Sequence, residues 1–246
     1  MTQTSAPAPD YRALLDQADT TAGQGQIREA TSSPPRDGTR IGREWIERLE
    51  QHSALLGYGL ADGDENAAIS VIDTGLTESE FDRWVVSNGW TAPGYIRWSF
   101  VSAMTVPAVS EAARAAIRYW PASTVRTGVQ LQALHGGRVE LRDGCFFVGE
   151  RGQAANKLAW FHAEVGLDID EAGFLILRDR VDGATRARIG EEMSWAGPAS
   201  AKIDDDARRA LQEACGPGDV LVVGSPESSE RFQMRVADVR NRGGPR

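Results

Sequence analysis

Residues 139–148 have the sequence Val139-Glu140-Leu141-Arg142-Asp143-Gly144-Cys145-Phe146-Phe147-Val148. Val139 and Leu141 alternate with charged residues, and this period of two is typical of a strand that is buried on one face. An Asp-Gly pair between two apolar runs favours the tight turn of a β-hairpin. The stretch therefore predicts two antiparallel strands joined at Asp143 and Gly144.

Similar short apolar runs, separated by glycine-rich turns, continue through the second half of the chain. They are Val129–Leu134, Leu158–Phe161, Phe174–Leu177, Arg186–Trp195 and Val220–Val223. Their spacing predicts a small antiparallel sheet or barrel over residues 123–226. One late helix is expected at Asp205–Ala214, because Asp204 to Asp206 would lie at the positive end of its dipole.

The preceding segment, residues 41–122, alternates between helical and strand patterns. The expected elements are a helix at Ile41–Leu56, a strand at Ala67–Asp73, a helix from Thr77 to about Ser87, a strand at Tyr95–Val101 and a helix at Pro107–Tyr119. Thr77 and Glu80 have the spacing of a capping box, which marks a helix start. The predicted fold is α+β, with an α/β half at 41–122 packed on the β-rich half at 123–226.

The two ends are predicted to be tails. Residues 1–40 are rich in small and polar residues and have too little apolar area to pack, so a disordered tail or tether is expected. Residues 227–246 are expected to form a C-terminal tail.

Composition limits the classes of partner. Hydrophobic residues make up 41% of the 246 residues and charged residues 25%, which is typical of a water-soluble globular protein. The net charge of −8 disfavours nucleic-acid binding, because phosphate backbones are also negative. No apolar run approaches the roughly 20 residues of a transmembrane segment, and residues 1–9 show no secretory signal. The partner itself is not indicated.

One candidate catalytic residue follows an apolar strand. The segment Ile69-Ser70-Val71-Ile72-Asp73-Thr74-Gly75 resembles the signature of aspartic proteases, in which two Asp residues share a proton and activate water. A hydrolase would use Asp73 as its acid and would need a second carboxylate nearby. The alternative is a strand-to-helix turn in which Asp73 serves local geometry.

The same region resembles a calcium loop of the EF-hand type. Asp62, Asp64, Asn66 and Asp73 would supply oxygen ligands, so Ca²⁺ is the one cofactor that the sequence suggests. Two departures from the pattern are Ala67 in place of the turn glycine and Asp73 in place of a bidentate Glu. The alternative is an acidic, solvated loop.

Several tryptophans could line a binding groove. Trp98, Trp120, Trp160 and Trp195 are the candidates for carbohydrate or peptide binding, with core packing as the alternative. The two cysteines, Cys145 and Cys215, are either buried free thiols or one disulfide in an oxidising compartment.

Residues 106–226 resemble uncharacterised proteins of proteobacteria. The motifs are Arg118-Tyr119-Trp120-Pro121-Ala122-Ser123, Leu141-Arg142-Asp143-Gly144-Cys145-Phe146, Gly190-Glu191, Trp195, Gly197-Pro198, Cys215-Gly216 and Val222-Val223-Gly224. Several such proteins are similar to envelope lipoproteins. The resemblance implies a removed signal, a lipid tether at the N-terminus, an oxidised Cys145–Cys215 pair and a periplasmic or envelope location. Without it, a cytoplasmic location is expected.

These observations favour a non-enzymatic binding or scaffold module. A hydrolase that uses Asp73 and a calcium-stabilised domain are the two alternatives. The sequence does not identify a substrate or an oligomeric state.

Overall fold

The computed structural model describes residues 9–16, 25–61, 68–126, 131–197 and 203–242. The chain divides into two compact units. The N-terminal unit comprises residues 21–103 and 125–129, and the barrel unit comprises residues 1–20, 104–124 and 130–246. The predicted α+β class is confirmed. The main division lies at residue 103 and not near residue 122, because Val109 and Ala122 form bridges to Leu167 and Phe161 of the barrel unit.

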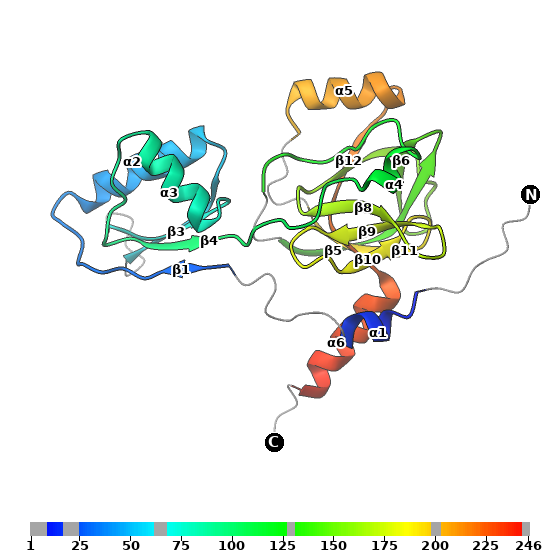
Figure 1. The fold of residues 1–246 in the computed structure, drawn as a ribbon, viewed down its shortest axis with the longest axis horizontal. Coiled ribbons are helices and arrows are strands. Elements are labelled where there is room, and N and C mark those ends of the chain that lie inside the picture. The colour runs from blue at the N-terminus through cyan, green and yellow to red at the C-terminus, as the bar shows by residue number, and fades with distance from the viewer. Residues whose placement is uncertain (1–8, 17–24, 62–67, 127–130, 198–202, 243–246) are drawn as a thin grey trace, which may run out of the picture. The chain divides into compact units, whose positions relative to one another are not determined.

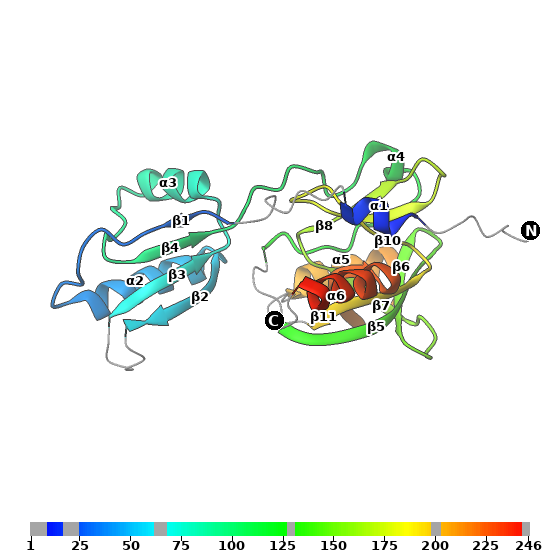
Figure 2. The same cartoon turned by 90° about the horizontal axis from the view of Figure 1, so that it is seen from below.

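The N-terminal unit is a four-stranded sheet with two helices on one face (Figures 1 and 2). Its elements are β1 (Ile27–Arg28), α2 (Gly38–Gln51), β2 (Leu55–Leu60), β3 (Ile69–Thr74), α3 (Glu78–Ser87) and β4 (Arg97–Phe100). The strand order is β1-β4-β3-β2, and β3–β4 is the parallel pair. Trp45 of α2 and Phe81 of α3 pack with Ile72 and Trp98 of the sheet in one core.

The barrel unit contains a closed five-stranded barrel and a separate three-stranded sheet. Its elements are α1 (Tyr11–Asp16), α4 (Glu111–Arg114), β5 (Leu131–Arg142), β6 (Cys145–Glu150), β7 (Lys157–Phe161), β8 (Val165–Ile169), β9 (Leu175–Asp179), β10 (Thr185–Arg188), β11 (Glu192–Gly197), α5 (Asp205–Cys215), β12 (Val220–Ser228) and α6 (Ser229–Arg242). The barrel order is β11-β12-β7-β6-β5, and the second sheet has the order β10-β9-β8. Leu167 and Leu177 of the second sheet share a core with Phe146 and Val223 of the barrel. A barrel and the late helix α5 are therefore confirmed, but the barrel is not wholly antiparallel as expected, because β12 pairs with β7 in parallel.

Two local sequence signals, the hairpin turn and the capping box, are confirmed in the backbone geometry and the hydrogen bonds. Arg142 pairs with Cys145 across the turn, and Asp143 and Gly144 have φ values of 48° and 78°, as a two-residue hairpin of type I′ requires. At the start of α3, the Thr77 hydroxyl accepts from the Glu80 N–H, and the Glu80 carboxylate accepts from the Thr77 N–H.

The helix expected at Pro107–Tyr119 is reduced to the four residues of α4. The backbone N–H of Ser110 donates to Leu167 and that of Arg118 donates to Gly144. These bonds to the barrel unit hold the flanking segments in non-helical conformations, so tertiary contacts override the helical pattern.

Both expected tails contain regular structure. In α1 the buried Tyr11 donates a hydrogen bond to the Glu191 carboxylate, and Arg12 forms an ion pair with Asp238 of α6 at 2.7 Å. Ile27 and Arg28 pair with β4. The segment expected as a C-terminal tail instead forms α6, which begins directly after β12.

A disulfide joins Cys145 at the start of β6 to Cys215 at the end of α5, with Cα atoms 5.7 Å apart. This bond holds α5 near the barrel strand β7, where Leu211 packs against Leu158 and Trp160.

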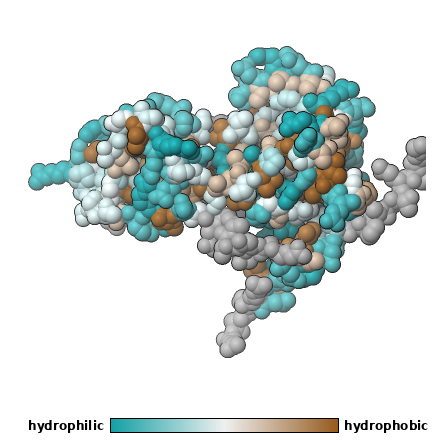
Figure 3. Space-filling model, viewed as in Figure 1, coloured by the Kyte–Doolittle hydropathy of each residue, from teal (hydrophilic) through white to brown (hydrophobic). Residues whose placement is uncertain are grey.

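Exposed apolar side chains are scattered. The large ones are Ile27, Tyr58, Val86, Val125, Leu134 and Val239, and they lie on different elements. On the face shown in Figure 3, apolar residues are interspersed with polar ones. No helix in the described part of the chain has the length and apolar composition to cross a bilayer.

Candidate functional site

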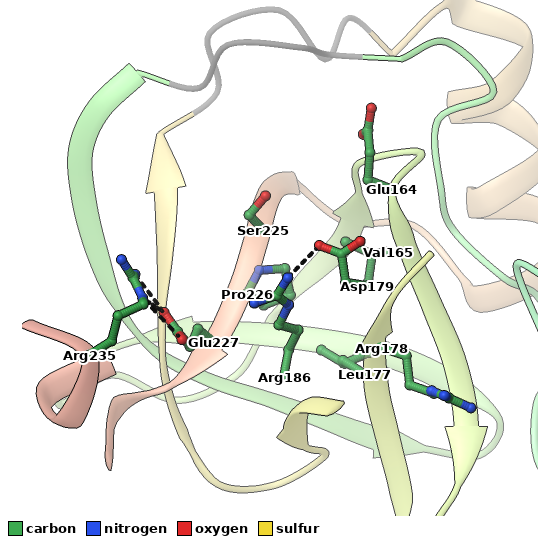
Figure 4. Close-up of a pocket in the computed structure, with 10 residues that line it drawn as sticks. All are labelled: Glu164, Val165, Leu177, Arg178, Asp179, Arg186, Ser225, Pro226, Glu227 and Arg235. Atoms are coloured by element: carbon green, nitrogen blue, oxygen red, sulfur yellow. Dashed lines mark hydrogen bonds and ion pairs between the residues drawn. The ribbon is translucent and has the colours of Figure 1, made fainter. Parts of the chain in front are cut away.

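A cavity of about 180 Å³ lies in the barrel unit between the three-stranded sheet and the end of β12 (Figure 4). Its walls come from four parts of the chain that are distant in sequence. They are Glu164 and Val165, Leu177 to Asp179 of β9, Arg186 of β10, and Ser225 to Glu227 of β12 with Arg235 of α6. Most of these side chains are polar, and six of them are charged.

One side of the cavity is bordered by an ion-pair cluster with a net positive charge. Glu227 is buried and accepts from two guanidinium groups, with Oε1 at 2.5 Å from Arg231 Nη1 and Oε2 at 2.8 Å from Arg235 Nη2. We name these three residues the Glu227 cluster; two cations and one anion leave it with a charge of about +1. Arg231 is also buried, and burial lowers the pKa of its guanidinium, as does the nearby charge of Arg186.

The buried cation also has unused hydrogen-bonding capacity. The Nε of Arg231 has no acceptor among the described residues. A buried N–H group without a partner costs roughly 1–3 kcal/mol, so this arrangement is retained at the expense of stability.

The other side is bordered by an ion-pair cluster with a net negative charge. Arg186 Nη2 donates to Asp179 Oδ2 and to Asp182 Oδ2, both at 2.7 Å. These three residues form the Asp179 cluster, with two anions and one cation. Glu164 also lines the cavity, and in Figure 4 its carboxylate points away from Asp179. Arg231 and Asp182 stand behind this lining, so each cluster presents one anion and one cation to the cavity: Glu227 and Arg235 on one side, Asp179 and Arg186 on the other.

Ser225, at the edge of this cavity, has a strained backbone. Its φ is 42°, in the left-handed region, which costs an L-residue other than Asn or Asp roughly 1–2 kcal/mol. The cause is a β-bulge, because Ala196 pairs with Gly224 whereas Ser194 pairs with Glu227, and β12 therefore has one extra residue. Such strain persists where the surrounding structure enforces it, and it is concentrated at binding and catalytic sites.

The cavity is small and mostly polar. Its titratable lining groups are carboxylates and guanidinium groups. Its volume is below the roughly 300–1,000 Å³ of cavities that hold drug-sized ligands. A small polar molecule is the ligand class that fits.

Asp73 lies elsewhere, in β3 of the N-terminal unit. It pairs in register with Gly57 and Ser99, and it lies on the sheet face opposite to the buried Ile72 and Thr74. Asp73 does not line the cavity described above. Its register partners in the sheet, Gly57 and Ser99, supply no second carboxylate, so an aspartic-protease role for Asp73 stays a prediction.

Three of the four calcium candidates, Asp62, Asp64 and Asn66, lie outside the described residues. Within the described ranges, no three His, Cys, Asp or Glu side chains form a group that could hold a metal ion. A calcium site at residues 62–73 therefore stays a prediction.

The candidate tryptophans contribute to two separate cores. Trp98 lies in the N-terminal unit, and Trp160 and Trp195 lie in the barrel unit; each is at most 3% exposed. Trp120 is partly buried and stacks on Phe161 with 4.9 Å between ring centroids. These four residues do not line one common groove.

The residues of the cavity were not among those singled out from the sequence. Glu227, Arg231 and Arg235 are spaced at i, i+4 and i+8, which is the pattern of side chains that meet on one helical face. Residues 227–246 are predicted to form a C-terminal tail, so this spacing did not point to a site. Asp179 and Arg186 had no comparable signal.

Comparisons with protein-family models, with curated proteins and with solved structures find no match.

Proposed function

We propose that the chain is a binding module whose barrel unit holds a small zwitterion, such as a free α-amino acid. The observation that supports this is the pair of ion-pair clusters, each with an anion and a cation in the lining, that border one cavity. The anionic group of the ligand would lie near Arg235, and its cationic group would lie near Asp179 and Glu164. Charge-assisted hydrogen bonds of this kind are stronger than neutral ones.

The size and the strain of the site support the same ligand class. The volume of about 180 Å³ is below the roughly 300–1,000 Å³ of cavities for drug-sized ligands, which favours a ligand as small as an amino acid. The left-handed Ser225 holds its hydroxyl at the edge of the cavity, where it would donate to the carboxylate of the ligand.

We further propose that the module works in an oxidising compartment, such as the bacterial envelope. The Cys145–Cys215 disulfide supports this location, because disulfides persist in secreted and periplasmic proteins and are rare in the reducing cytosol.

The test is isothermal titration calorimetry of the full chain with single amino acids and glycine betaine. Acetate and methylammonium, each with one charge of the zwitterion, serve as matched controls. We expect at least one zwitterion to bind. Neither acetate nor methylammonium should bind with comparable affinity. A ligand at 100 times its Kd should also stabilise the barrel unit by about 2.7 kcal/mol.

Variants assign the binding to this cavity. Arg235→Gln should weaken binding about tenfold, and it should fold because the Arg235 side chain is 49% exposed. Asp179→Asn should also weaken binding, because it removes a negative charge near the cationic group of the ligand. Arg209→Gln is the control, since Arg209 makes an exposed ion pair with Asp206 on α5. Equal binding by acetate, or unchanged binding in Arg235→Gln and Asp179→Asn, would refute the proposal.

A further inference from the structure

The N-terminal unit has a cavity of its own, an open groove of about 420 Å³ between α2 and β2. Ile46 and Leu60 supply apolar surface, and Tyr58 stands exposed beside them. Arg43, Glu47 and Glu50 of α2 complete the wall. The volume lies within the range of cavities that hold ligands.

The strand that borders this groove is an edge strand. In the order β1-β4-β3-β2, β2 is last, and it pairs with β3 alone among the described strands. Gly57, Tyr58 and Gly59 pair in regular register with Asp73, Ile72 and Val71, between two irregularities. The outer N–H and C=O groups of an edge strand are a template for another extended chain.

The charged groups of the groove are available to a partner. Arg43, Glu47 and Glu50 are exposed and make no ion pair with any other described residue, whereas Glu44 on the same helix pairs with Arg40. Arg43 and Glu47 are one helical turn apart, about 6 Å along the axis. Two residues of a strand span about 6.6 Å and point to the same face.

We propose that an extended peptide pairs with β2 and fills this groove. The peptide has an acidic residue opposite Arg43 and, two positions away, a basic residue opposite Glu47 and Glu50. A second copy of the chain fits less well, because β2 itself (Leu55–Leu60) has no charged side chain to match these groups.

The probe is the capped heptapeptide Val-Thr-Glu-Thr-Lys-Thr-Val, together with its reverse-order counterpart. The control is Val-Thr-Glu-Lys-Thr-Thr-Val, which has the same composition but places Glu and Lys on opposite faces. A probe N-methylated at alternate residues cannot form the strand hydrogen bonds. Binding to the full chain is followed by fluorescence anisotropy and by amide chemical shifts.

We expect shifts in the amide signals of Leu55–Leu60 and affinity at least tenfold higher for one probe than for the control and methylated peptides. The double variant Glu47→Gln, Glu50→Gln should weaken binding about three- to tenfold, whereas Glu213→Gln, an exposed site on α5, should not change it.

Three outcomes would overturn the proposal. The first is that no probe shifts the β2 signals. The second is that the control or methylated peptide binds as tightly as the probes. The third is that the β2 signals change with protein concentration alone while light scattering shows dimers, in which case the occupant is a second copy.

Discussion

Breaking the Cys145–Cys215 disulfide should destabilise the barrel unit selectively. The bond closes a loop with a sequence separation of 70 residues between β6 and α5. In the chain-entropy model, a loop of that length lowers the entropy of the unfolded chain by roughly 15 cal/mol/K, or about 4.4 kcal/mol at 25 °C. We therefore expect the reduced chain to lose about 4 kcal/mol of unfolding free energy, a large part of the roughly 5–15 kcal/mol typical of a domain.

The assay is urea unfolding of oxidised and reduced protein, followed by hydrogen-exchange mass spectrometry of individual strands. Strands β6 and β7 report on the barrel unit, and β3 in the N-terminal unit is the internal control. The variant Cys145→Ala, Cys215→Ala separates the lost bond from the effect of the reductant. Two results would refute the reasoning. One is that reduction lowers the unfolding free energy of β6 and β7 by less than 1 kcal/mol, and the other is that it lowers that of β3 equally.

Four further predictions concern single residues of the barrel unit. Tyr11→Phe removes the donor to the half-buried Glu191 carboxylate and should lower the unfolding free energy by about 1–3 kcal/mol at pH 7 in urea titrations; a loss within error would contradict it. Burial raises the pKa of Glu191 above the ordinary value of 4.5 for a Glu carboxyl. The folded state therefore binds its proton more tightly, and the stability of the wild type relative to Glu191→Gln should be highest below pH 4.5 and fall as pH rises through the folded pKa. Gly144→Ala should cost at least about 1–2 kcal/mol, because φ is 78° and the new Cβ would lie 2.8 Å from the Arg118 nitrogen; melting curves test this against Gly152→Ala, whose Cβ would meet nothing within 4 Å. Ser225→Gly should relieve strain and stabilise the unit by up to about 1 kcal/mol while weakening ligand binding in calorimetry, and unchanged affinity would show that the hydroxyl has no role.

The sequence predicted those features that a few neighbouring residues determine. Asp143 and Gly144 specify their turn because both positions need positive φ, and Thr77 and Glu80 specify a helix start through reciprocal hydrogen bonds. The repetition of such hairpin signals predicted the barrel. The parallel β7–β12 pair could not be predicted, because no local signal marks a partner strand that lies some 60 residues further along the chain.

The ends of the chain and the cavity depend on distant residues. Tyr11 is ordered by Glu191, which is 180 residues away, so the composition of residues 1–40 alone suggested disorder. Glu227 and Asp179 face one cavity only because β9 and β12 lie near each other in the folded barrel unit. Asp73 was prominent in the sequence because its strand and turn resembled a known signature, yet no partner carboxylate adjoins it in the sheet.

The parallel pairing of β7 with β12 also sets the order of events during synthesis. The β5–β6 hairpin and β7 emerge from the ribosome first, but the barrel has no closing strand until residues 220–228 are made. At about 5–20 residues per second, that interval lasts roughly 4–14 s, during which two strand edges are open to other chains. Chaperone binding to nascent chains should therefore be strongest at intermediate lengths and should end once α6 has joined α1.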